Sequence, residues 1–343
     1  MESCPYGLNL SYFLVAIGYN LVEVNSFRAG QFRKAQGRKA KTDSIDARSV
    51  ADILSLGNHK PLCIPDPILD NLKELTRFRS DLAEDKAATI IHLKEVLSVL
   101  FPEFENVFKR LDSAGSLALL MAFPCPEHVI AAGEERVGKV LSGASPHRLG
   151  RGMAIRIIEA ARDTVGVTQK QPALGIKISI LTSRIMNLQS TMRDLDRQII
   201  ALFSTVPCQP KGFPVGRATS LAAIVAEIGD VKRFPTLKKF LSHLGWCPQT
   251  FQTGGYRLEH PKMSHAGSRY VRRLIWMLSI LAIRTVPRYR VYFQRRVGEG
   301  KAKMHILVAV GRKLLSALYS MLKTGVDYDP NWEENSRTAL ARH

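Results

Sequence analysis

At 343 residues the chain is long enough for two or three domains with their own cores, and its hydrophobic fraction of 45% is ordinary for a soluble protein. It contains no run of the roughly 18 apolar residues that a membrane span needs, and its five scattered cysteines include no CxxC pair, which disfavours a membrane protein, a disulfide framework and a zinc site. The scattered cysteines favour a reducing cytoplasm, and the formal net charge of +19 favours binding of a polyanion.

The N-terminal part of the sequence predicts helices and a strand in alternation. Residues 8–17 are typical of a helix and residues 21–24 of a strand. Residues 25–41 are basic and contain glycine, which predicts a connection. A helix follows, with Thr42 or Asp43 as its N-cap. This succession is compatible with an α/β layer.

Two carboxylates, Asp43 and Asp46, lie three positions apart at the start of that helix, which places them on one face. With further acidic residues from elsewhere in the fold, such a pair can share a divalent ion. Aspartate is also common in the first turn of a helix, because it caps the helix and interacts favourably with its dipole. The spacing alone therefore favours a structural role.

Two long segments, residues 67–100 and 173–203, have apolar residues at helical spacing among many charges. They predict long amphipathic helices, and residues 101–172 between them predict a small helical insertion. The pattern fits an antiparallel or intermolecular coiled coil about as well as it fits two helices of one bundle, because the heptad register is imperfect.

The excess positive charge is concentrated in residues 211–325, which contain 21 lysines and arginines against four carboxylates. Within this segment we expect a glycine-rich turn opening a helix over residues 218–228, a strongly basic helix over 269–284 and a last helix over 304–323. Arginines and aromatic residues alternate after residue 269, with few acidic neighbours. Contact with nucleic-acid phosphates is a better explanation than a solvated charged face.

Two hydroxyl groups, those of Thr253 and Ser264, lie in predicted basic loops of this segment. A hydroxyl becomes a nucleophile where a base or a positive field stabilises its alkoxide. Thr253 precedes two glycines, which allow a phosphate to approach the backbone, and Ser264 has Lys262, His265 and Arg269 nearby. On the residues alone, a turn residue at Thr253 and a helix cap at Ser264 are the favoured roles.

Taken together, these residues resemble the DEDD-type insertion-sequence transposases of the 110/116/902 group, which includes bridge-RNA-guided recombinases. The resemblance covers essentially the whole chain in the right order. The family's patterns match Thr42–Ala47, Glu227–Asp230 with Arg233 and Phe234, Leu244–Pro248 with Thr253 and Gly254, Met263–Gly267 with Val271 and Arg272, and, less closely, Glu2–Tyr6.

The resemblance implies a RuvC-like (RNase H-like) nuclease domain and a C-terminal domain that carries a catalytic serine. By this correspondence Glu2, Asp43 and Asp46 would bind Mg²⁺. Thr253 would hold the place of the nucleophilic serine, with Ser264 as the second candidate. The residues expected to bind nucleic acid are Arg38, Lys39, Lys262, Arg269, Arg272 and Arg273.

The expected fold is therefore α/β plus all-α. The family's first acidic residue should precede Glu2, so we expect an N-terminally truncated nuclease domain. Further departures from the family are Thr253 in place of serine and His265 in place of lysine. The expected domains are a partial RuvC-like domain (1–65), a long-helix, coiled-coil-like region with a helical insertion (66–205), a helical DNA-binding transposase domain (206–326) and a tail (327–343).

We expect DNA transposition by site-specific recombination, with the element ends and target DNA as substrates. The resemblance further implies a structured guide RNA and a homo-oligomer, and no membrane partner. The alternative is a truncated remnant of such a transposase that binds nucleic acid without cutting it.

Overall fold

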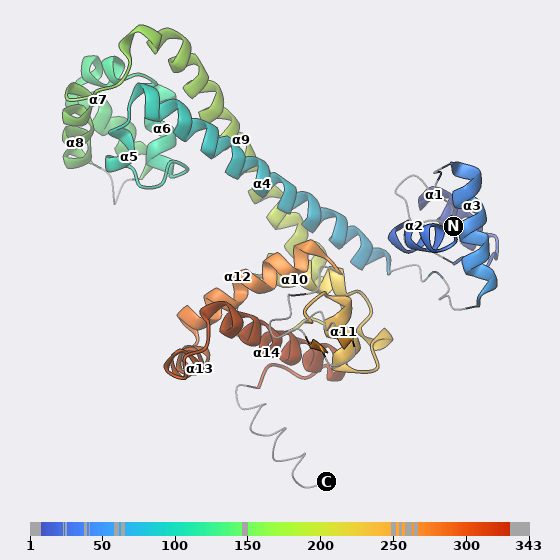
Figure 1. Cartoon of the computed structure of the whole chain (residues 1–343). Coiled ribbons are helices and arrows are strands. Elements are labelled where there is room, and N and C mark those ends of the chain that lie inside the picture. The colour runs from blue at the N-terminus through green and yellow to red at the C-terminus, as the bar shows by residue number, and fades with distance from the viewer. Residues whose placement is uncertain are drawn as a thin grey trace. The chain divides into compact units, whose positions relative to one another are not determined.

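The computed structural model describes most of the chain, in two compact units, Met1–Asp66 and Pro67–His343 (Figure 1). Five of the predicted site residues, Glu2, Arg38, Lys39, Lys262 and Ser264, lie outside the described residues. The described residues are 8–22, 24, 26–37, 40, 42–57, 62, 66–145, 150–247, 252–253, 256–257, 263 and 267–329.

The described part of the first unit consists of helices around a small core of Val24, Ala29 and Ile53. The side chain of Thr42 accepts a hydrogen bond from the backbone N–H of Ile45, so Thr42 is the N-cap of the third helix. The helices are α1 (Leu8–Ala16), α2 (Ser26–Ala35) and α3 (Asp43–Ser55).

Two sequence predictions for this unit differ from the structure. Residues 25–41 were expected to be a connection, but they contain the ten-residue helix α2. Of the strand expected over residues 21–24, the described residues contain only isolated bridge residues, Val22 and Val24. The α/β character of this unit, and with it the RuvC-like fold, stays a prediction.

The second unit is organised by two 34-residue helices, α4 (Pro67–Leu100) and α9 (Gln171–Ser204), which pack against each other along their length (Figure 1). Leu72 near the start of α4 belongs to the same core as Ile199 near the end of α9. The helices are therefore antiparallel neighbours within one chain. Their boundaries agree closely with the prediction from apolar spacing.

The segment between α4 and α9 forms a helical lobe with its own core. Phe104 is fully buried there and stacks on Phe108, with ring centroids 5.0 Å apart. The core joins the end of α4 to the start of α9, so the predicted helical insertion is confirmed. Its helices are α5 (Phe104–Val107), α6 (Ala114–Ala122), α7 (Pro126–Ala144) and α8 (Arg151–Arg162), followed by the 3₁₀ turn η2 (Thr168–Lys170).

The C-terminal part packs on the other end of the α4–α9 pair, because α10 contacts both long helices. Its elements are α10 (Ala218–Ile228), η3 (Val231–Arg233), α11 (Leu237–His243), β1 (Gln252–Thr253), β2 (Tyr256–Arg257), α12 (Arg269–Thr285), α13 (Pro287–Gly298) and α14 (Lys303–Thr324). The strands are antiparallel, with Thr253 opposite Tyr256.

Helix α14 is the central element of this C-terminal core. It is long and apolar enough to cross a membrane by length and composition, as is the bent pair α6 and α7 if the two are counted together. However, Val310, Leu314 and Leu318 of α14 are fully buried against the other helices of the C-terminal part. Its apolar face therefore forms protein core.

The closest approach in this core is at Gly311 of α14. A methyl group placed there would lie 2.4 Å from a ring carbon of Trp246 and 2.9 Å from the hydroxyl oxygen of Ser279 on α12. Trp246 cannot move freely, because it is buried and its indole N–H donates a hydrogen bond to the carbonyl of Val308 at 3.0 Å.

We therefore expect Gly311→Ala to lower the free energy of unfolding by about 1–3 kcal/mol through overpacking. Urea unfolding measures this. The matched control is Gly298→Ala at the end of α13, where the added methyl group would meet nothing within 4 Å. Equal effects of the two substitutions would contradict the packing described for Trp246.

Candidate nucleic-acid interface

The two predicted metal ligands that the structure describes, Asp43 and Asp46, lie in the first turn of α3. A guanidinium nitrogen of Arg33 on α2 lies 2.5 Å from a carboxylate oxygen of Asp46, and both side chains are largely buried. Among the described residues there is no cluster of three groups able to hold a metal ion. These two carboxylates, one of them paired with an arginine, do not by themselves supply the several oxygen ligands that a divalent ion needs.

A buried ion pair connects α4 to the C-terminal part. The guanidinium of Arg77 binds both carboxylate oxygens of Glu227 at the end of α10, at 2.5 Å and 3.0 Å. The Glu227 side chain is only 4% exposed, so its charge needs this partner. The Arg77 guanidinium also lies over the ring of Tyr270 on α12, 5.3 Å from its centroid. Arg77 thereby links three helices.

The residues after Glu227 form a compact turn. Gly229 ends α10 with a φ of 64°, a conformation that favours glycine, and the side chain of Asp230 accepts a hydrogen bond from the backbone N–H of Lys232. The guanidinium of Arg233 then lies over the ring of Phe234 and contacts the Nε2 atom of His243 at 2.7 Å. Residues 227–234, which match one of the family's patterns, therefore have structural roles in this turn.

His243 lies at the end of α11, partly exposed, against Phe234 and Arg233. Partial burial and the adjacent positive charge of Arg233 lower the pKa of His243 below its ordinary value. The ring is thus held in its neutral form at neutral pH.

Both candidate hydroxyls are carried by residues 247–266, and the ends of this segment lie close together. The preceding residue, Trp246, is buried, and the backbone N–H of Trp246 is bonded to the carbonyl of Leu241 in α11. The following residue, Gly267, lies against the backbone of α11: a methyl group at Gly267 would be 2.5 Å from the His243 carbonyl oxygen. We call residues 247–266 the hydroxyl loop.

Within the hydroxyl loop the backbone of Thr253 is placed in strand β1, opposite Tyr256. Ser264 lies outside the described residues. On the residues alone a helix cap was the favoured role of Ser264, but the N-cap of α12 is Ser268, whose side chain accepts a hydrogen bond from the backbone N–H of Val271. The cap is therefore four residues later than that alternative placed it.

The basic helix α12 begins directly after the hydroxyl loop, and its first arginines face α4. Arg269 lies 3.8 Å from Asp81, and Arg273 lies 2.5 Å from Glu84. Arg272 donates a hydrogen bond to the carbonyl of Gly267. Two of the three arginines of α12 that the sequence assigned to phosphates, Arg269 and Arg273, thus have carboxylate partners. These partners were not among the predicted site residues, because charges on α4 are typical of a solvated helix face.

Helix α13 is also strongly basic, and its residue Tyr292 makes cation–π contacts with basic side chains. The ring of Tyr292 has the Arg295 guanidinium 5.7 Å and the Lys313 ammonium 5.0 Å from its centroid. The only acidic residue between positions 284 and 303 is Glu299, which pairs with Arg295 and Arg296. This helix continues the positive surface that begins at α12.

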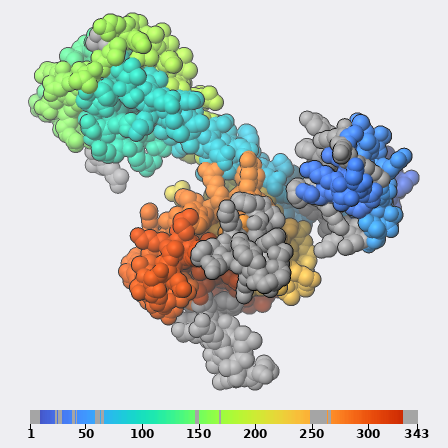
Figure 2. Space-filling view, in the orientation of Figure 1, coloured from blue at the N-terminus to red at the C-terminus, as the bar shows by residue number. Residues whose placement is uncertain are grey.

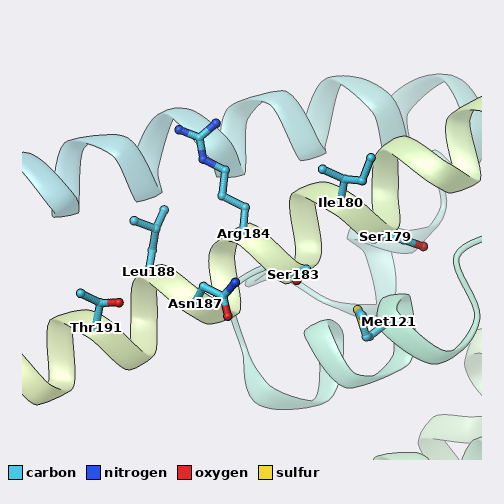
Figure 3. A pocket seen from close by; sticks show the side chains of 8 residues that line it. All are labelled: Met121, Ser179, Ile180, Ser183, Arg184, Asn187, Leu188 and Thr191. Atoms are coloured by element: carbon cyan, nitrogen blue, oxygen red, sulfur yellow. The ribbon is translucent and has the colours of Figure 1, made fainter.

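A groove of about 590 Å³ lies elsewhere, on α9 beside α6 (Figure 3). It has no carboxylate or imidazole, so it offers no acid–base chemistry. It does not include the hydroxyl loop or α12. The residues that line it are Met121, Ser179, Ile180, Ser183, Arg184, Asn187, Leu188 and Thr191.

Comparison with known proteins identifies the family. A transposase model of the DEDD insertion-sequence 110 type matches residues 2–102, and a model of the transposase IS116/IS110/IS902 family matches residues 214–294. The chain belongs to the IS116/IS110/IS902 transposase family. Family membership makes it a DNA transposase or recombinase, and the DEDD designation points to divalent-metal dependence in general.

Relatives of this transposase come from several bacteria. It is 26% identical to an insertion element IS110 protein of Streptomyces coelicolor, over 85% of this chain and 73% of the relative. It is 28% identical to an insertion element IS116 protein of Streptomyces clavuligerus, over 90% of this chain and 78% of the relative. A pilin gene-inverting protein of Moraxella bovis is 23% identical over 50% of this chain and 56% of its own length.

We expect Glu227→Gln to lower the free energy of unfolding by about 2–3 kcal/mol, because the substitution leaves Arg77 without its charge partner. The cost is below that of a fully buried pair, since the Arg77 side chain is 35% exposed. Urea unfolding with Glu135→Gln as control tests this: Glu135 pairs with Lys139 in the exposed part of α7, and its loss should cost less than about 0.5 kcal/mol. Similar costs would show that the Arg77–Glu227 pair is not an anchor.

Because the pKa of His243 is lower in the folded than in the unfolded chain, acidification favours the unfolded state. The loss of stability should begin as the pH falls below about 6.5, the pKa of a histidine in the unfolded chain. It should be complete once the pH is below the pKa of His243 in the folded chain. His243→Gln should therefore reduce the loss of melting temperature between pH 7.5 and pH 5.5, whereas His128→Gln, at an exposed position of α7, should not. Identical acid sensitivity in wild type and His243→Gln would disprove this.

Proposed function

We propose that this transposase breaks and rejoins DNA through a hydroxyl of the hydroxyl loop, with Thr253 as the first candidate and Ser264 as the second. The hydroxyl oxygen attacks a backbone phosphorus, and the bond from phosphorus to one deoxyribose oxygen breaks. The attacking hydroxyl loses a proton and the released deoxyribose oxygen gains one. The resulting phosphodiester between protein and DNA keeps the energy for rejoining, so the step needs no co-reactant.

The observation that carries this proposal is the position of Trp246 and Gly267, the residues that flank the hydroxyl loop. Its two ends meet at the backbone of α11, through the close approach of Gly267 to His243. Helix α12 begins just after the loop, and positions 262–273 contain four arginines or lysines and no carboxylate. A loop held in this way beside positive charge suits the attack of a hydroxyl on an anionic phosphate.

The DNA-binding role is assigned to the positive surface of the C-terminal part. Arg269, Arg272 and Arg273 of α12 begin it, and α13 continues it; Lys262 belongs to the hydroxyl loop, and Arg38 and Lys39 belong to the first unit. Guanidinium groups bind phosphate oxygens with paired hydrogen bonds, which positions a backbone without reading its sequence. We further propose a structured guide RNA and a homo-oligomer, which rest on the family resemblance.

Binding of Mg²⁺ by Glu2, Asp43 and Asp46 is proposed on the same resemblance. The spacing of Asp43 and Asp46 on one helical turn supports it. The Arg33–Asp46 ion pair opposes it and favours the alternative function, a nucleic-acid-binding protein that does not cut. The strand-exchange step proposed above uses only groups of the chain.

We expect Thr253→Ala to lower the rate of strand exchange between element-end and target duplexes by roughly 1,000-fold or more, because the nucleophile is lost. Thr253→Ser should retain activity. Thr285→Ala, which removes an exposed hydroxyl bonded only within α12, is the matched control and should leave the rate unchanged. Gel analysis of labelled strands measures product, with and without the structured RNA of the element.

The reverse pattern, loss with Ser264→Ala and not with Thr253→Ala, moves the nucleophile to Ser264. Full activity of both variants contradicts the hydroxyl mechanism. Binding of DNA by a wild-type chain that forms no product supports the alternative function.

A further inference from the structure

Two carboxylates of α4 hold the arginines at the start of α12. Asp81 accepts a hydrogen bond from the hydroxyl of Tyr270 at 3.1 Å and lies 3.8 Å from Arg269. Three positions further along, Glu84 lies 2.5 Å from Arg273. We call these contacts the α4–α12 latch. Figure 2 shows α12 in orange against α4 in cyan.

A carboxylate and a phosphate present the same feature to a guanidinium, namely two negatively charged oxygens in one plane. Arg269 and Arg273 are the same side chains to which the proposed function assigns DNA phosphates. A guanidinium that points its donors at Asp81 or Glu84 has fewer donors left for a phosphate. The latch and the DNA backbone therefore compete for these two arginines.

The latch is suited to exchange because its pairs are exposed. The side chains of Arg269 and Asp81 are 68% and 51% exposed, and those of Arg273 and Glu84 are 52% and 50% exposed. Ion pairs in such surroundings contribute little to stability. The buried Arg77–Glu227 pair and the apolar contacts of α10 attach the C-terminal part to α4 independently. The latch can open without unfolding the protein.

We infer that Asp81 and Glu84 act as an internal substitute for DNA phosphates, which lowers the DNA affinity of the free protein until a duplex displaces them. This inference rests on the proposed function, because it requires α12 to bind DNA. Displacement also frees the side chains at the start of α12 from α4.

The test is the affinity of the full-length chain for a fluorescent 30-base-pair duplex, measured by anisotropy across a series of salt concentrations. Asp81→Asn combined with Glu84→Gln should tighten binding roughly tenfold at 0.1 M salt, because the arginines no longer have competing carboxylates. The salt dependence should also become steeper, by up to about one further counterion for each released arginine.

The matched control neutralises two carboxylates elsewhere in the same unit, Glu135→Gln with Asp194→Asn. Both residues pair with a basic residue on their own helix, Lys139 and Arg197, so the change in net charge is the same. It should alter affinity less than about twofold. Adding Arg273→Ala to the latch variant should reverse the gain.

Unchanged affinity of the latch variant, or an equal gain in the control, would overturn the latch while leaving the DNA-binding function intact. Absence of salt-dependent DNA binding in wild type and in both variants would overturn the proposed function and the latch together. Circular dichroism of each variant confirms that it is folded.

Discussion

The ion pair between Arg77 and Glu227 is the contact on which the arrangement of the C-terminal part depends. A carboxylate that is almost completely buried needs a permanent counter-charge, and Arg77 provides it through two hydrogen bonds. The end of α10 is therefore fixed on α4. The turn at Gly229 and the stacked Arg233 come directly after this fixed point in the chain, and Tyr270 of α12 lies against the same Arg77 guanidinium.

Other residues of the family pattern also have structural roles in the C-terminal part. Trp246 fills the space beside Gly311, and Gly267 permits contact with the backbone of α11. These contacts bring together the ends of the hydroxyl loop. The described part of this scaffold thus consists of buried, uncharged contacts together with the Arg77–Glu227 ion pair, whereas the arginines of α12 and α13 lie near solvent. Because the arginines are separate from the buried contacts, they can exchange carboxylate partners for phosphates while the scaffold stays unchanged.

The features that the sequence predicts well are local. Apolar spacing located the long helices α4 and α9, and the cap at Thr42 follows from the preference of threonine for that position. Helix α2 was missed because its residues have little apolar periodicity and include Gly30. The sequence could not decide whether α4 and α9 pair with each other or form a coiled coil between two chains, since both arrangements bury the same apolar stripe of each helix.

The features that could not be predicted join distant positions. Arg77 and Glu227 are 150 residues apart, and Arg273 and Glu84 are 189 residues apart, so one sequence contains no signal that pairs them. The same holds for the Arg33–Asp46 pair, which turns an apparent metal ligand into an ion-pair partner. The roles of Thr253 and Ser264 stay predictions, because a hydroxyl is recognised as a nucleophile by its surroundings.

The most direct test of the central claim is to trap the covalent protein–DNA intermediate. A nicked element-end duplex, which loses the strand needed for rejoining, should accumulate it. Protease and nuclease digestion followed by mass spectrometry would then locate the attached nucleotide. We expect the adduct on the peptide that contains Thr253, or on the one that contains Ser264. Cleaved DNA without any protein adduct, or an adduct outside residues 247–266, would contradict it.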